Sequence, residues 1–129
     1  MKITYPKLTF SLIALLTIIT FGAFQNTPGK ISISESESDE TYEITASYGL
    51  EKIQQVHNFL NESFAPTPVF NSVNDYFEKT FTFENKMRLY IKTNPGKLLL
   101  ILNKQENSEE SLEWMKNLYT GLEETLLQR

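Results

Sequence analysis

Residues 87–102, MRLYIKTNPGKLLLIL, contain two strand patterns separated by a turn. Apolar and polar side chains alternate from Met87 to Lys92, which is the period of a strand with one buried face. Asn94-Pro95-Gly96 is typical of a tight turn, because proline fixes φ at the first corner and glycine accepts a positive φ at the second. Residues 98–102 are all apolar, which favours a strand covered on both faces. Because the connection is short, we expect the two strands to pair antiparallel.

Three stretches on the N-terminal side of this hairpin have the same period of two. One directly precedes it and completes a three-strand meander. The other two flank the polar sequence Glu37-Ser38-Asp39-Glu40 and predict a separate hairpin, whose first strand is weak because serine and glutamate fill it. The alternating residues of the three stretches are Ile31 and Ile33; Tyr42, Ile44, Ala46 and Tyr48; and Lys79, Phe81 and Phe83.

Two stretches have the period of an amphipathic helix. The first spans Leu50–Phe64 and is stopped by Pro66 and Pro68, since proline cannot donate a helical hydrogen bond. The second is expected to begin with Asn107 as its cap and Glu110 completing a capping box. The predicted buried stripes are Ile53, Val56, Leu60 and Phe64 in the first helix, and Leu112, Met115, Tyr119, Leu122 and Leu126 in the second.

The order of elements is therefore ββ-α-βββ-α. We expect an α+β fold, a two-layer sandwich in which an antiparallel sheet of about five strands carries both helices on one face. The expected organisation is a leader at residues 1–23, a flexible linker at 24–30 and a single domain at 31–129, which is a common domain size.

The first 23 residues have the order of a secretory signal peptide. The basic Lys2 and Lys7 precede an apolar run, and the small Gly22 and Ala23 follow it as alternative cleavage positions. The other interpretation is an uncleaved membrane anchor, because Leu8–Phe24 is 17 residues long and a bilayer core of about 30 Å is spanned by little more. Either way the remaining chain is exported, so we expect a periplasmic or extracellular protein that touches the membrane only if the leader stays.

Composition excludes several classes of function. Without Lys2 and Lys7, the chain keeps 10 of its 12 basic residues and all 16 acidic ones, a net charge of −6. That charge repels phosphate backbones, so nucleic acid is not an expected partner. The chain has no cysteine, which removes disulfides, thiol catalysis and cysteine-rich zinc sites. No phosphate loop, nucleophile motif or cofactor signature is present, so we expect no cofactor.

Three features are interpreted as structural rather than catalytic. His57 is the only histidine, and it lies at the edge of a buried stripe without a recognisable catalytic partner. The acidic run Glu35–Glu43 offers oxygen ligands for calcium, but its spacing is not that of an EF-hand loop, and a solvated hairpin tip is the favoured interpretation. Trp114 lies off the main helical stripe, at the margin of the core. We expect no metal site.

The sharpest pattern is a cationic and aromatic stripe made of Lys86, Arg88, Tyr90 and Lys92, which strand alternation places on one face. This stripe is either a solvent-facing strand whose charges discourage edge pairing, or a binding surface for a protein partner or an anionic ligand. The leader-proximal segment or the loop at residues 66–76 could instead cover the face.

We expect the chain to be a small exported, non-enzymatic binding module that uses this exposed face of the sheet. The alternatives are a small exported enzyme with His57 or a carboxylate pair as acid and base, and a membrane-anchored accessory protein of the cell envelope.

Overall fold

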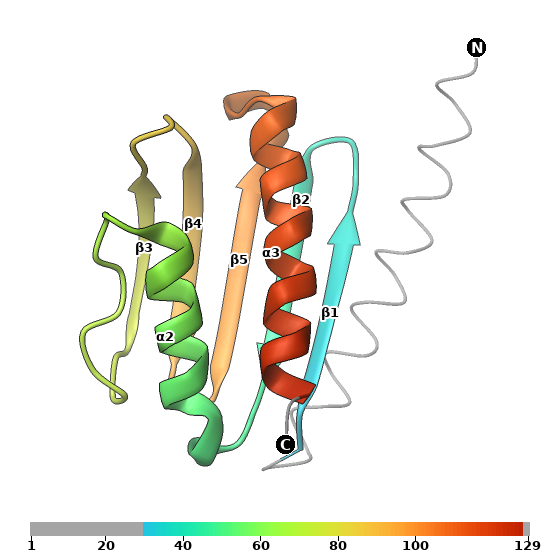
Figure 1. Ribbon diagram of the computed structural model, residues 1–129. Helices are drawn as coiled ribbons and strands as arrows, with labels where there is room; N and C mark the ends of the chain where they lie inside the picture. Colours follow the sequence, from blue (N-terminus) through green and yellow to red (C-terminus); the bar gives the residue numbers. More distant parts are fainter. Residues whose placement is uncertain (1–29, 128–129) are drawn as a thin grey trace.

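The computed structural model of the chain describes residues 30–127, which form one five-stranded antiparallel sheet with two helices. Both helices lie on the same face of the sheet (Figure 1), which confirms the expected α+β fold. The elements in chain order are β1 (Ser32–Glu37), β2 (Thr41–Ser47), the short 3-10 helix η1 (Leu50–Lys52), α2 (Ile53–Phe64), β3 (Phe77–Thr82), β4 (Arg88–Asn94), β5 (Lys97–Asn103), the short 3-10 helix η2 (Lys104–Glu106) and α3 (Glu109–Leu127).

The strands are ordered β1-β2-β5-β4-β3, so the most apolar strand, β5, is central. It pairs on one side with β2, in a register that places Ile44 opposite Leu100, and on the other side with β4. Leu98, Leu100 and Leu102 face the helices and are buried. Leu99 and Ile101 point to the opposite face and are half-buried, so the expectation of cover on both faces holds only for the helix side.

The core is the layer between the sheet and the two helices. All four residues of the stripe predicted for α2 are buried, as are Leu89 and Ile91 on the inner face of β4 and Met87 just before this strand. The predicted turn is also confirmed, because Gly96 has φ 89° and its carbonyl accepts a hydrogen bond of 2.9 Å from the backbone N–H of Tyr48. This turn therefore closes one hairpin and ties the end of β2 to it.

The capping prediction for α3 was wrong by one residue. Ser108 is the cap, because its Oγ accepts a hydrogen bond of 3.1 Å from the N–H of Ser111. Asn107 instead bridges to Arg88, with its Oδ1 accepting from the N–H at 2.8 Å and its Nδ2 donating to the carbonyl at 3.0 Å. Through these two hydrogen bonds Asn107 joins the segment before α3 to the start of β4, so its side chain does not cap the helix.

The buried stripe of α3 is rotated slightly from its predicted position. The structure buries Leu118, while Leu112 and Tyr119 are only partly buried against the core. The buried positions are Ser111, Met115, Leu118, Leu122 and Leu126. This rotation turns Trp114 and Gly121 toward α2, where they form part of a groove described below.

The expected leader and most of the expected linker lie outside the described residues. Within residues 30–127, neither helix is long and apolar enough to cross a membrane.

Candidate functional site

The open face of the sheet, opposite the helices, carries three of the four residues of the predicted stripe. Arg88, Tyr90 and Lys92 alternate along β4 with buried residues and therefore share this face. The register places Tyr90 opposite Ile101 and Lys92 opposite Leu99 on the central strand. The middle of the sheet therefore carries an aromatic ring, two half-buried aliphatic side chains and two cations on this face.

Lys86 lies outside β4, in the turn that joins β3 to β4. Its backbone has φ 72°, and its N–H donates to the carbonyl of Phe83 at 2.8 Å. The turn spans three residues between Phe83 and Met87, whose backbone groups pair at 2.9 Å. Strand alternation does not extend through such a turn, so Lys86 is not placed on the open face with the other three.

Each polar group of the stripe has a carboxylate near it. The Tyr90 hydroxyl donates to Glu78 Oε2 at 2.7 Å, and this hydrogen bond, more than desolvation, raises the pKa of Tyr90. Arg88 forms an ion pair with Glu106 at 3.4 Å, with both side chains about half exposed. Lys92 lies opposite Glu78 in the β3–β4 register. The stripe is thus a row of charged and aromatic groups at the surface rather than an isolated cationic patch.

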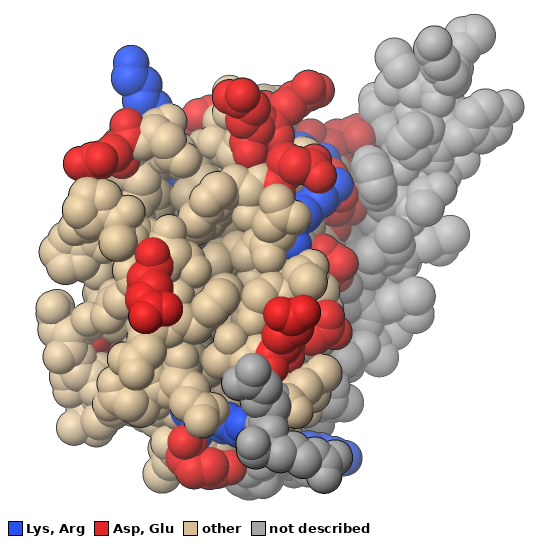
Figure 2. Space-filling model, viewed as in Figure 1, with Lys and Arg blue, Asp and Glu red and all other residues tan. Residues whose placement is uncertain are grey.

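The helix side of the molecule has the opposite electrostatic character. Figure 2 shows carboxylates distributed around this face with few basic side chains among them. The exposed or partly exposed acidic residues of the two helices are Glu62, Glu109, Glu110, Glu113, Glu123 and Glu124, and Lys116 is the single basic residue within the two helices. Cations other than Lys116 are therefore concentrated on the sheet and on the connections.

The loop between α2 and β3 does not cover the open face. Val69 and Phe70 are buried in the core, and the ring of Phe70 stacks on His57 with centroids 4.2 Å apart. Asn61 of α2 holds the same loop through hydrogen bonds to the backbone of Phe70. The loop therefore belongs to the helix side of the molecule.

His57 is 4 % exposed and forms part of this packing. Burial lowers the pKa of His57, and this outweighs the charge of Asp75 and the hydrogen bond to the backbone of Ser72, which both act to raise it. The imidazole is surrounded by the ring of Phe70 and the backbone of the loop, so it packs the loop against α2.

The acidic run does not form one cluster. Glu37 makes ion pairs of 2.7 Å with Lys104 and 3.2 Å with Lys116, and its side chain is only 13 % exposed. The interpretation of this run as a solvated hairpin tip is therefore wrong for Glu37, and it holds for Asp39 and Glu40, which are exposed. Among residues 30–127, no group of three or more histidine or acidic side chains is placed to hold a metal ion.

A groove of about 360 Å³ lies beside these ion pairs, between β1 and α3. Its walls include Tyr42, Tyr119 and Lys116, and the Tyr42 hydroxyl donates to Glu35. Burial, and after it the hydrogen bond to Glu35, raises the pKa of Tyr42. Glu35 and Glu37 of the edge strand β1 both point to the helix side. Their contacts with Tyr42, Lys104 and Lys116 join β1 to the rest of the fold.

No protein-family model matches the sequence, and comparisons with curated proteins and with solved structures find no significant similarity.

Proposed function

We propose that the chain is a non-enzymatic binding module, and that its open sheet face receives an acidic segment of a partner protein. The observation that supports this proposal is the position of Tyr90 beside Ile101 and of Lys92 beside Leu99. Apolar surface rimmed by charge on an open sheet is typical of a contact surface. An export signal at residues 1–23 would place this module outside the cytoplasm.

The chemistry of the partner follows from the charges of the face. Arg88, Lys92 and Lys97 lie around the aliphatic pair and outnumber the two carboxylates of this face, Glu43 opposite Ile101 and Glu78 opposite Lys92. Complementary charge mainly directs encounter and register, while aromatic and aliphatic side chains supply the contact area. A segment that combines carboxylates with aliphatic residues matches both properties.

The test uses a short synthetic peptide that alternates glutamate with leucine. Nuclear magnetic resonance titration should shift amide signals of β4 and β5 saturably and leave those of α2 unchanged. Arg88→Glu with Lys92→Glu should abolish the shifts, because exposed like charges then face each other. Tyr90→Ala should weaken binding through lost contact area.

The control is Lys86→Glu, which reverses one positive charge in the turn and should leave binding intact. Added salt should weaken binding, because exposed charges are screened beyond about 8 Å at physiological ionic strength. Unchanged titration curves for the double reversal would refute the assignment of this face.

A further inference from the structure

Two adjoining grooves lie along the seam between α2 and α3. One has a volume of about 240 Å³ and reaches the β3–β4 turn at Glu84 and Asn85. The other has a volume of about 270 Å³ and reaches Gly121. Ser63 and Trp114 line both of them, so the two grooves adjoin at Trp114, and together they are called the seam groove.

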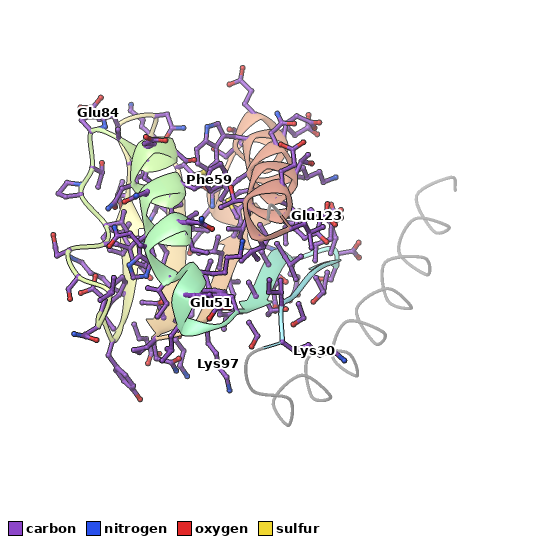
Figure 3. The ribbon with its side chains drawn as sticks, turned by 60° about the horizontal axis from the view of Figure 1, so that its bottom comes forward. Lys30, Glu51, Phe59, Glu84, Lys97 and Glu123 are labelled. Carbon is purple, nitrogen blue, oxygen red and sulfur yellow. The ribbon has the colours of Figure 1, made fainter. Side chains whose placement is uncertain are left out.

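The floor of the seam groove is aromatic and closely packed. Phe64 lies 4.7 Å from Phe83 and 5.5 Å from Trp114 between ring centroids. Phe59 lies between the two helices (Figure 3), and a Cβ added at Gly121 would be 2.6 Å from its ring. The glycine thus lets the helices and the Phe59 ring approach closely. A floor fixed in this way is largely formed before any ligand arrives.

The rim of the seam groove is acidic. Glu84 is a lining residue, and the exposed Glu62 and Glu113 directly precede the lining residues Ser63 and Trp114 in the chain. The nearest basic residue in the chain is Lys86, between the lining residues Asn85 and Met87 of the β3–β4 turn. Lys116, the basic residue of α3, forms an ion pair with Glu37 of β1, on the side of α3 that faces away from α2. In Figure 2 uncharged atoms occupy the middle of this face, and carboxylates lie around them with a few basic side chains at the edges.

We propose that the seam groove binds an extended, basic segment of a partner protein, which inserts an apolar side chain on each side of Trp114 and places lysine or arginine against the acidic rim. Each of the two grooves has a smaller volume than the roughly 300–1,000 Å³ of a small-molecule site, and this volume suits one side chain. Tryptophan in a partly buried position is a common anchor of protein contacts. Acidic segments and phosphate backbones are repelled by the rim.

This surface is independent of the open sheet face and selects the opposite charge. The two surfaces lie on the two sides of the sheet, so occupation of one leaves the other accessible. An acidic peptide tests the sheet face and a basic peptide tests the seam groove.

The experiment uses Trp114 as its own reporter, because it is the only tryptophan of the chain. The probe is a short synthetic peptide that alternates arginine with leucine and phenylalanine. Titration should change the tryptophan emission saturably. Glu62→Lys with Glu113→Lys should weaken binding about tenfold or more, since the rim then repels the peptide. Both residues are exposed, so the melting curve of this variant should remain cooperative.

The matched control is Glu40→Lys, which changes an exposed charge at the distant β1–β2 turn and should not alter the titration. An emission change that a glutamate-containing peptide reproduces, or that survives the Glu62 and Glu113 reversals, would overturn the proposal. Sedimentation provides a further readout. A dimer that dissociates in the double reversal, without peptide binding to the wild type, would assign the groove to a second copy of the chain and also overturn it.

Discussion

Asn61 pairs with the backbone of Phe70 in the way that a neighbouring strand would. Its Nδ2 donates to the carbonyl of Phe70 and its Oδ1 accepts from the N–H of Phe70, both at 2.9 Å. The ring of Phe70 stacks on His57, which precedes Asn61 by one helical turn. One side of α2 therefore positions the loop to β3 through a side-chain amide and an imidazole.

Replacing Asn61 by alanine should lower the free energy of unfolding by about 1–3 kcal/mol, because the N–H and carbonyl of the buried Phe70 lose their partners. Denaturation by urea measures this change, and hydrogen exchange should accelerate at the amide of Phe70. The control is Asn58→Ala, an exposed position on the same helix, which should change stability by no more than about 0.5 kcal/mol. Equal effects of the two substitutions would show that the pairing does not contribute to stability.

Lys86→Gly should stabilise the protein by about 1 kcal/mol, because the φ of 72° at this position strains any residue with a Cβ and suits glycine. A three-residue hairpin loop commonly ends on a residue in this conformation. Thermal unfolding monitored by circular dichroism checks the prediction. Lys92→Gly, in the middle of β4, should instead destabilise the protein, and a lower melting temperature for both variants would contradict the argument.

Glu37→Gln should destabilise the fold by about 1–2 kcal/mol, because it weakens the ion pairs that join β1 to Lys104 and Lys116. The effect is kept modest by Lys116, whose side chain is 40 % exposed, so solvent screens its share. Urea denaturation at low and high salt should show a larger difference at low salt. Glu40→Gln is the matched control, and a similar loss there would mean that the ion pairs contribute nothing specific.

These contacts also show where sequence patterns are informative. The strand from Met87 onward, the Pro95-Gly96 turn and the first helix follow from local periods and local turn chemistry, and the structure confirms them. Periodicity also predicts helix α3, but it assigns the cap to Asn107, because the sequence cannot reveal that this side chain binds the backbone of Arg88.

The same limit applies to the candidate sites. Alternation predicts that Arg88, Tyr90 and Lys92 share a face, but it cannot show that the strand begins after Lys86. The ion pairs of Glu37 join residues that are far apart in the sequence, and no local pattern indicates them. The seam groove depends on the packing of two helices against each other, so Trp114 and Gly121 acquire their setting only in the folded chain.

Alkaline pH should unfold the protein through Tyr42 and Tyr48. Burial is the main cause that raises the pKa of each, and the hydrogen bond to Glu35 adds to the effect at Tyr42. A raised pKa in the folded state means that the native protein keeps a proton which the unfolded chain loses near pH 10. The stability due to these protonated side chains is therefore complete below about pH 10 and is lost as the pH rises above it.

Above pH 10, each of the two tyrosines should lower the free energy of unfolding by about 1.4 kcal/mol per pH unit until its native pKa is reached. Urea denaturation at a series of pH values measures this slope, and absorbance of tyrosinate should appear together with unfolding. Tyr48→Phe should reduce the slope by about 1.4 kcal/mol per pH unit, because one linked proton is removed. A stability that stays level from pH 9 to pH 11 would show that neither hydroxyl is protected by the fold.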